Sequence, residues 1–277
     1  MPGRITEIIN KEGNMFSYSF EVTPDILPDI KDFELENLDL EPEFFSVTWH
    51  AQVHECTSFE IAPLKLAKYL RYKGKIVLLH ISCCNMRKNY LDDLLVLLKD
   101  IGICNLFIIL GEKFDSFNSD FGSSQDMIIH IRRSTGNYFC ICVAGFPERE
   151  GNILQLKEKV KCGVDFILIQ AFFEFKAFQK FVMDCKEADI NVPIIPGIFP
   201  FETENELQGF MKLCRVHDQE NIVIKKLSNL SGTEIVTELV NEITQQLQIK
   251  HLHFFTLNKM QRTTNLIRNI GNKRNIN

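Results

Sequence analysis

No stretch of this sequence approaches the roughly 20 consecutive apolar residues that a membrane-spanning helix needs. The first residues lack the apolar core of a secretion signal, and their mixed acids and bases are not typical of a transit peptide. Basic residues are too few for a dedicated nucleic-acid binder, since 31 Lys and Arg stand against 36 Asp and Glu, a net charge of −5. The sequence therefore predicts a cytoplasmic protein with no membrane partner and no nucleic-acid partner.

Closely spaced Cys-x-x-Cys pairs are also missing, although the chain has nine cysteines. Zinc sites use such pairs, and an odd count without a secretion signal does not suit a disulfide framework. The pair His50 and His54 has the spacing of a metal pair on a helix but no third ligand. Most cysteines stand in or beside apolar runs, as Cys83 and Cys84 do. We predict reduced, buried thiols and no metal site.

Linkers and low-complexity segments are absent inside the chain, and its composition is that of an ordinary globular protein. Of its 277 residues, 45% are hydrophobic and 24% are charged. A chain of this length buries a sizeable core and forms one large domain or two small ones.

Short β-rich runs recur along the chain and alternate with longer stretches of helical periodicity. Several runs are apolar at consecutive positions, which is typical of parallel strands covered by helices. Eight strands are predicted: Tyr18–Val22, Phe44–Thr48, Ile76–Ser82, Leu106–Leu110, Cys140–Ala144, Phe166–Gln170, Pro193–Ile198 and His251–Thr256. The clearest helices are predicted over Leu91–Ile101, Phe175–Ala188, Glu204–Val216 and Thr233–Leu247.

Eight strands alternating with helices predict an α/β fold, a single (β/α)8 TIM-type barrel over residues 1–277. We expect about 15 residues at the N-terminus and about 8 at the C-terminus to fray. The alternative is an open doubly wound sheet, but no Gly-x-Gly-x-x-Gly follows the first strand.

In such a barrel, functional side chains gather where the strands end. Glu21 is the most informative of them, because a carboxylate in an otherwise apolar strand costs heavy desolvation unless it has a role. An enclosed Glu with a raised pKa suits a general acid. The alternative is a salt bridge that closes the barrel mouth.

Other polar residues at the strand ends allow a functional and a structural interpretation. His80 is either a site residue or a core histidine bonded to a carbonyl, and Gln170 is either a ligand contact or a structural amide. Trp49 and His50 would equally suit a packed loop, and the 157–159 run would suit a solvated helix face. Residue patterns alone therefore predict a barrel enzyme with an acid at the end of its first strand.

The strand ends, in this order, resemble methylenetetrahydrofolate reductase, specifically the catalytic barrel of the eukaryotic form. The resemblance covers about residues 16–270, and nothing in the chain corresponds to the regulatory domain of the eukaryotic enzymes. The matching segments include Ser19-Phe-Glu21, Val47-Thr-Trp-His50, Leu79-His-Ile-Ser-Cys-Cys84, Val143-Ala-Gly-Phe-Pro147, Gln170-Ala-Phe-Phe-Glu174, Pro193-Ile-Ile-Pro-Gly-Ile-Phe-Pro200 and His253-Phe-Phe-Thr-Leu-Asn258.

The resemblance implies an FAD enzyme that passes a hydride from NADPH or NADH to 5,10-methylenetetrahydrofolate, giving 5-methyltetrahydrofolate. It implies that Glu21 is the general acid that helps to open the five-membered ring of the folate. The FAD-binding positions it implies are Thr48, Trp49, His80, Ser82, Leu110, Gly111, Ala144, Gly145, Phe146, Asn152 and Lys159. The substrate positions are Glu112, Gln170, Phe255 and Lys259. The choice between NADPH and NADH, and whether the chain forms a homo-oligomer, stay open.

Several residues depart from the family pattern around the cofactor. Leu110-Gly111-Glu112 stands where Arg-Gly-Asp is usual, the 148–152 loop is shortened, and Asn152 aligns with an Asp. Phe255 replaces Tyr and Lys259 replaces Arg. A second hypothesis is therefore a barrel that has lost FAD and binds folate or a partner as a pseudoenzyme. A flavin barrel such as proline dehydrogenase is disfavoured by the Thr-Trp-His and Pro-Gly-Ile-Phe-Pro segments.

Overall fold

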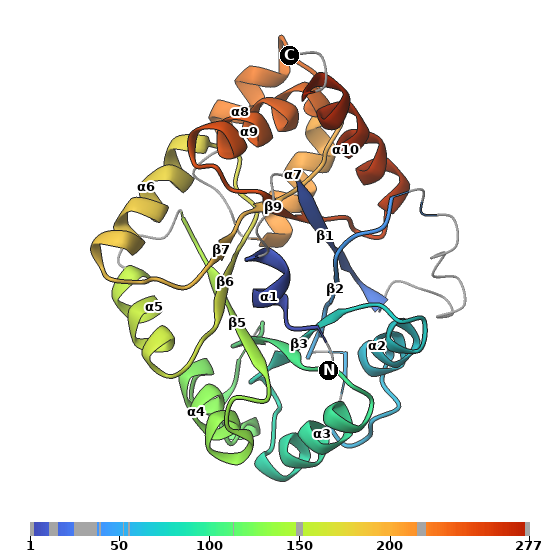
Figure 1. The fold of residues 1–277 in the computed structure, drawn as a ribbon, viewed down its shortest axis with the longest axis vertical. Helices are drawn as coiled ribbons and strands as arrows, with labels where there is room; N and C mark the ends of the chain where they lie inside the picture. Colours follow the sequence, from blue (N-terminus) through green and yellow to red (C-terminus); the bar gives the residue numbers. More distant parts are fainter. Residues whose placement is uncertain are drawn as a thin grey trace.

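Parallel strands ringed by helices make up the described part of the computed structural model, residues 3–10, 16–24, 38, 40–51, 53–54, 56–112, 114–147, 152–214 and 220–274 (Figure 1). The strands are β1 (Ser17–Val22), β2 (Phe45–Val47), β3 (Val77–Ser82), β4 (Asn105–Ile109), β5 (Cys140–Gly145), β6 (Phe166–Ile169), β7 (Ile194–Ile195), β8 (Gly197–Ile198) and β9 (His251–Phe255).

The sheet closes on itself through β7 and β8. Its strand order is β7-β6-β5-β4-β3-β2-β1-β9-β8, with β7 paired to β6 and β8 paired to β9. Only Pro196 separates β7 from β8, so the two are halves of the strand predicted as Pro193–Ile198. Proline has no N–H for the ladder, which explains the break, while its carbonyl accepts a hydrogen bond from the His253 N–H at 3.0 Å. The predicted barrel is confirmed.

Helices follow the strands and cover the outside of the barrel (Figure 1). The four helices predicted most clearly are present as α3 (Lys88–Asp100), α6 (Phe175–Glu187), α7 (Glu204–Cys214) and α9 (Gly232–Gln246). The others are α1 (Ile5–Ile9), α2 (Ala62–Tyr72), α4 (Ser124–Thr135), α5 (Asn152–Lys161), α8 (Glu220–Leu227) and α10 (Met260–Arg274), with a 3₁₀ turn at Ser116–Asn118. Among the helices described, none is long and apolar enough to cross a membrane.

Apolar side chains form two cores, one between the strands and the helices and one inside the barrel. The inner core includes Phe44, Leu78, Phe107, Cys142 and Phe166, all on strands or beside them. The nine cysteines are free thiols, and six of them are buried, in agreement with the prediction.

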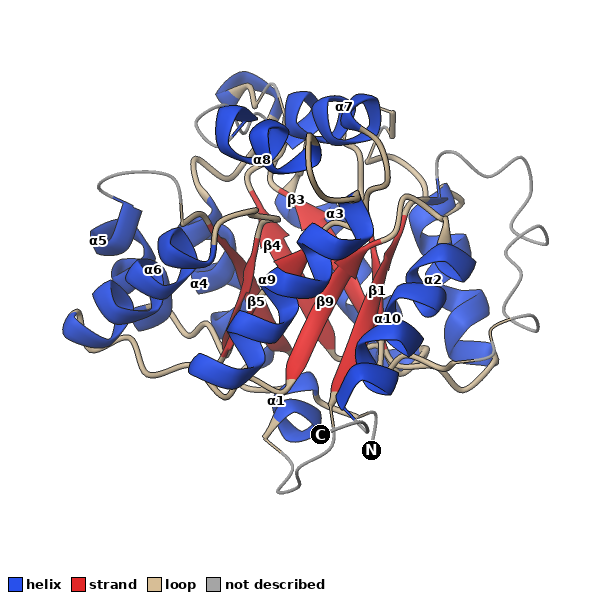
Figure 2. Ribbon diagram, turned by 90° about the horizontal axis from the view of Figure 1, so that it is seen from above, coloured by secondary structure: helices blue, strands red, loops and turns tan. Residues whose placement is uncertain are grey.

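Described segments near both ends of the chain pack against the barrel. Ile5 on α1 is fully buried in the inner core, and its N–H donates to the Asn105 side chain at 2.9 Å. Figure 2 shows α1 below the strands, where it plugs the amino-terminal end of the barrel. At the other end, α10 continues to Arg274 and Ile270 is fully buried. Apolar burial holds both segments in place.

The segment between β8 and β9 is long and contains α7, α8 and α9. Figure 2 shows α7 and α8 on the side of the barrel opposite to α1, above the carboxyl ends of the strands. Phe210 on α7 stacks on Phe199 with ring centroids 3.7 Å apart and an interplanar angle of 6°, so α7 is packed against the chain that leaves β8. This helix therefore covers part of the barrel mouth.

Asp165 ties three separate segments together at the amino-terminal end. Its carboxylate accepts a hydrogen bond from Arg132 at 2.6 Å and one from the Ile141 N–H at 2.6 Å, and it lies 3.6 Å from Arg4 beside α1. We expect Asp165→Ala to lower the free energy of unfolding by about 1–3 kcal/mol, because a partly buried donor set loses its acceptor. Urea denaturation measures this, with the surface pair variant Asp184→Ala as control, for which about 0–1 kcal/mol is expected. Equal effects of the two changes would contradict the assignment.

Candidate functional site

Glu21 lies at the carboxyl end of β1 with its side chain in the barrel mouth. Its register partners are Ser46 on β2 and Phe255 on β9, and its side chain is 14% exposed. Burial raises the pKa of Glu21 to about 8. The carboxyl group therefore keeps its proton at neutral pH, as a general acid must.

His80 on β3 is the ionisable side chain that lies within 4 Å of the Glu21 carboxyl. Its Nε2 is 3.9 Å from Glu21 Oε2 and 2.7 Å from the hydroxyl of Ser46. Burial, with a smaller contribution from His50, lowers the pKa of His80 to about 3, so the ring is neutral. Among the ion-pair contacts of the described residues, His80 is the partner of Glu21. Both groups are neutral, so they do not form the salt bridge that the alternative interpretation of Glu21 placed at the barrel mouth.

The raised pKa of Glu21 makes stability depend on pH. The folded state holds the proton more tightly than the unfolded chain, whose Glu ionises near 4.5, so this contribution to stability is lost as pH rises from about 4.5 to about 8. We expect Glu21→Gln to remove that loss. The stability of the variant relative to the natural chain should rise by about 3–4 kcal/mol between pH 5 and pH 8 in urea denaturation. A difference that does not change with pH would contradict the raised pKa.

Thr48 and Trp49 follow β2 and are both buried, at 6% and 2% exposure. The Thr48 Oγ1 and the Trp49 Nε1 have no hydrogen-bond partner among the described residues. A buried polar group left unpaired costs about 1–3 kcal/mol, so such atoms are usually satisfied by something bound. The two atoms mark the end of β2 as a place for a polar ligand.

Ser82, at the end of β3, ties down the segment that follows β4. Its hydroxyl donates to the Leu110 carbonyl at 3.3 Å and accepts from the Cys84 N–H at 3.1 Å. Gly111 has a φ of +94°, and a Cβ there would lie 2.1 Å from Ser82 Oγ, so only glycine fits. The Leu110 side chain is 43% exposed and Glu112 is exposed as well. The segment is thus fixed by its backbone, while both side chains reach solvent.

The FAD-binding positions predicted at the end of β5 and after it do not all face the barrel mouth. Ala144 and Phe146 are partly buried, whereas Gly145 faces outward, since a Cβ there would lie 2.5 Å from Ile169 Cδ1. Gly145 therefore allows close packing of β5 on β6, a role that its family position did not indicate. Asn152 begins α5, and its side chain lies outside the described residues.

Lys159 on α5 acts on the same end of the barrel. Burial raises the pKa of Cys83 to about 12, and the positive charge of Lys159 acts in the opposite direction by lowering it. The Lys159 charge therefore acts on Cys83, the residue that directly follows β3.

The three remaining substrate positions lie against α7 and α10. The Gln170 amide donates to the Cys214 carbonyl at the end of α7 at 3.1 Å. Phe255 is 8% exposed, and its ring centroid is 5.8 Å from that of Phe210 on α7. Lys259 donates to Glu206 on α7 at 2.9 Å.

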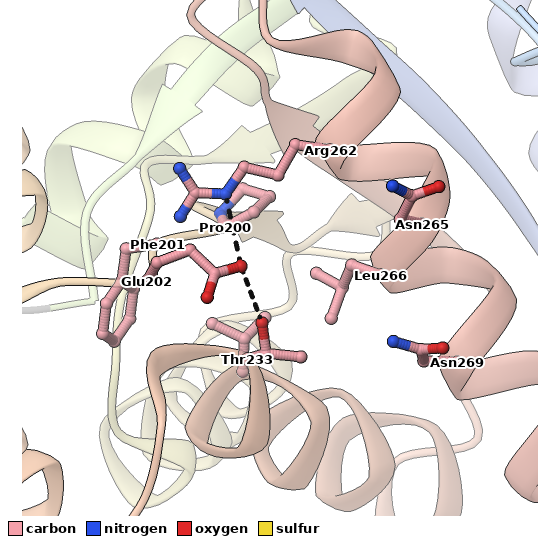
Figure 3. A pocket seen from close by; sticks show the side chains of 9 residues that line it. Pro200, Phe201, Glu202, Thr233, Arg262, Asn265, Leu266 and Asn269 are labelled. Atoms are coloured by element: carbon pink, nitrogen blue, oxygen red, sulfur yellow. Dashed lines mark hydrogen bonds and ion pairs between the residues drawn. The ribbon is translucent and has the colours of Figure 1, made fainter.

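Two hollows border α10, one of them against α7 and the other against α9. One, of about 150 Å³, is lined by Phe199, Phe210, Thr256, Lys259 and Arg262 among others. The other, of about 250 Å³, lies between Glu202, Thr233 and α10, and Figure 3 shows Glu202 bonded to Thr233 and paired with Arg262. Arg262 also binds Glu206 through both terminal nitrogens at 2.8 Å and holds the pKa of Glu206 well below its usual range. Sequence reasoning missed this pair, because nothing in the spacing of 206 and 262 brings them together.

The structure thus brings Glu21, Thr48, His80, Ser82 and Phe255 together at one end of the barrel, on β1, β2, β3 and β9 or directly after them. Sequence reasoning also missed the polar partners that lie deeper in the barrel, Ser46, Ser19 and His253. The signal was present, since Ser17, Ser19 and Glu21 recur with the period of two that puts side chains on one face of a strand.

A family model for methylenetetrahydrofolate reductase matches residues 4–271. The chain belongs to the methylenetetrahydrofolate reductase family. The resemblance found in the strand-end segments is therefore confirmed.

Curated relatives agree with this membership. The chain is 29% identical to a "Probable methylenetetrahydrofolate reductase (NADH)" of Oryza sativa, with 92% of this chain and 48% of that protein covered. It is 30% identical to "Methylenetetrahydrofolate reductase 2" of Schizosaccharomyces pombe (97% and 47%) and 25% identical to a Buchnera aphidicola reductase (84% and 82%). The chain spans about half the length of the first two.

A solved structure shares the fold. It is a Clostridium thermocellum protein described as binding two copies of 5-methyl-5,6,7,8-tetrahydrofolic acid, with a TM-score of 0.69, 14% identity and coverage of 97% of this chain and 99% of that one.

Proposed function

We propose that this chain reduces 5,10-methylenetetrahydrofolate to 5-methyltetrahydrofolate, with NAD(P)H as the source of electrons and FAD as the resident cofactor. One observation supports this most directly: a buried, protonated Glu21 stands at the mouth of a barrel of this family. Relatives are named as NADH and as NADPH enzymes, so the proposal commits to neither nucleotide.

Glu21 would serve as the acid for ring opening. Its carboxyl proton passes to the departing ring nitrogen, the carbon–nitrogen bond breaks, and the resulting iminium carbon can accept a hydride. Glu21 is then a carboxylate and must recover one proton before the next turnover. The neutral His80 at 3.9 Å cannot hold Glu21 in its ionised form, so the carboxylate returns readily to the acid.

The residues at the ends of β2 and β3 fit FAD. Thr48 Oγ1 and Trp49 Nε1 offer a hydroxyl and an indole N–H without partners among the described residues, and the Lys159 ammonium lies near the same end. These residues and His80 would hold the flavin, which supplies the hydride chemistry when bound. Leu110 presents an exposed apolar side chain where the family has the Arg for the phosphates, so we propose that FAD is held weakly.

Colour provides the first test. Protein purified from a flavin-rich host, or supplemented with FAD, should be yellow with absorbance near about 450 nm and should convert the folate with NAD(P)H. Protein that stays colourless after addition of FAD would overturn the proposal.

The exposed Leu110 also favours a second candidate, a folate-binding barrel that works without FAD. Calorimetry with 5-methyltetrahydrofolate on flavin-free protein separates the two. Binding together with colourless, inactive protein supports the second candidate, whereas yellow, active protein supports the first.

We further propose a cytoplasmic location. All nine cysteines are free thiols, and burial raises the pKa of several of them, as it does for Cys83 and Cys185 to about 12. Unpaired thiols in this number suit a reducing compartment.

A further inference from the structure

A chain of hydrogen bonds runs through the interior of the barrel along β1 and β9. Ser17 Oγ lies 2.8 Å from His251 Nδ1, and His251 Nε2 lies 3.1 Å from Ser19 Oγ. Ser19 Oγ in turn lies 2.8 Å from His253 Nδ1. Ser17 is partly exposed at the amino-terminal end of the barrel, whereas Ser19 and His253 are fully buried. We call Ser17, His251, Ser19 and His253 the lower chain.

A second, shorter set of polar contacts ends at Glu21. Ser46 Oγ lies 2.7 Å from His80 Nε2, which lies 3.9 Å from Glu21 Oε2. We call Ser46, His80 and Glu21 the upper chain. In the register of β1 and β9, His253 pairs with Ser19, and Glu21 is the next residue of β1 on the same face, so the lower chain ends one such position below Glu21.

His253 Nε2 is the unpaired atom at which the lower chain ends, next to the upper chain. It is buried and has no hydrogen-bond partner among the described residues, although Nδ1 of the same ring is bonded. Phe44 stacks on both His251 and His253 with centroids 5.3 and 6.1 Å apart, which keeps these rings in position. A buried polar atom in polar surroundings is where proteins hold an ordered internal water.

Every ring of the lower chain is neutral. Burial lowers the pKa of His251 to about 3 and holds the pKa of His253 well below its usual value. A neutral imidazole has one donor and one acceptor nitrogen, and a hydroxyl both donates and accepts. Ser19 can donate to one imidazole while it accepts from the other, so the bonds of the lower chain can all point the same way, either toward Ser17 or toward His253 Nε2.

We propose that one water molecule next to His253 Nε2 joins the lower chain to the upper chain, and that Glu21 recovers its proton along this path from the amino-terminal end of the barrel. The water site stands on the geometry alone, whereas the use of the path rests on the proposed function. The path matters during turnover, when a bound substrate would close the mouth side, from which the Glu21 side chain is 14% exposed.

The proton balance is simple. The Glu21 carboxylate takes a proton from the water, which takes the Nε2 proton of His253. His253 Nδ1 then receives the Ser19 proton, Ser19 receives that of His251 Nε2, and His251 Nδ1 receives that of Ser17. Ser17 takes one proton from solvent, so one proton enters and one reaches Glu21. No ring becomes charged, and hydroxyl rotation with tautomer exchange restores the starting direction.

A crystal structure at high resolution tests the water directly. We expect an ordered water within hydrogen-bond distance of His253 Nε2 and of the Glu21 carboxyl. A dry site there would overturn the proposal, whatever the chain catalyses.

Ser19→Ala tests the path, because it removes one oxygen between two imidazoles. Cys142→Ala, which removes one atom from the opposite wall of the same interior, is the matched control. In D₂O, the exchange of the Glu21 carboxyl proton, followed by infrared spectroscopy on flavin-free protein saturated with 5-methyltetrahydrofolate to cover the mouth, should slow about tenfold or more in Ser19→Ala and stay unchanged in the control. An unchanged rate in Ser19→Ala would overturn the path without touching the proposed reductase activity.

In active protein the same variant should show a burst. The first turnover should stay within about twofold of the natural chain, because Glu21 starts protonated, while later turnovers should slow about tenfold. Equal loss in first and later turnovers would mean that Ser19 is structural. Where Ser19→Ala does not fold, Ser17→Ala interrupts the same path at its solvent end and is expected to show the same pattern.

Discussion

Glu21→Gln is expected to lower folate reduction by about 10²–10⁴-fold while the protein stays folded. Gln has nearly the same shape but no acidic proton, and Glu21 is already uncharged at neutral pH, so the substitution adds no new charge to the barrel mouth. Oxidation of NAD(P)H with a quinone as acceptor does not require this acid and should continue at close to the natural rate. Stopped-flow measurement of the two reactions separates them.

Glu187→Gln is the matched control for this experiment. Glu187 is exposed at the end of α6, outside the site, and both reactions should be unchanged in that variant. Loss of both reactions in Glu21→Gln, to the same degree, would show that Glu21 is structural and would remove the main support for the proposed acid.

Leu110→Arg combined with Asn152→Asp is expected to tighten FAD binding by at least about tenfold, and up to about a hundredfold. A guanidinium fork near a pyrophosphate contributes about 1.5–3 kcal/mol for each charge-assisted hydrogen bond. The Leu110 side chain is 43% exposed, so the change loses little apolar burial. The backbone carbonyl of Leu110 is held by Ser82 and by the Cys84 N–H, so a new side chain starts from a fixed point. Quenching of flavin fluorescence gives the dissociation constant.

Val96→Arg controls for the added charge, since Val96 is 60% exposed on the outer face of α3. FAD affinity should not change in that variant. A natural chain that already binds FAD at nanomolar concentration would show that other residues hold the phosphates, and our interpretation of Leu110 would be wrong.

The sequence predicted the architecture well because its signals are local. The apolar run Phe166–Ile169 predicts β6 to within a few residues. The helical stripe of Leu91–Ile101 does the same for α3. The break at Pro196 was missed, although the residue was visible, because the strand changes partners there and pairing is not a local property. The fold of the plug at Ile5 was missed for the same reason, since its stability comes from side chains far along the chain.

By itself, the sequence determined the family and the barrel, and it predicted Glu21 as an acid at the end of the first strand. Only the tertiary structure decided how those residues behave. Burial among side chains from four strands gives Glu21 its raised pKa, and the meeting of β1 with β9 builds the chain from Ser17 to His253. The structure also turned Gly145 outward. The physical reason is that desolvation and hydrogen bonding depend on which side chains meet in space, and residues more than 230 positions apart, such as Ser19 and His253, give no local signal that they will.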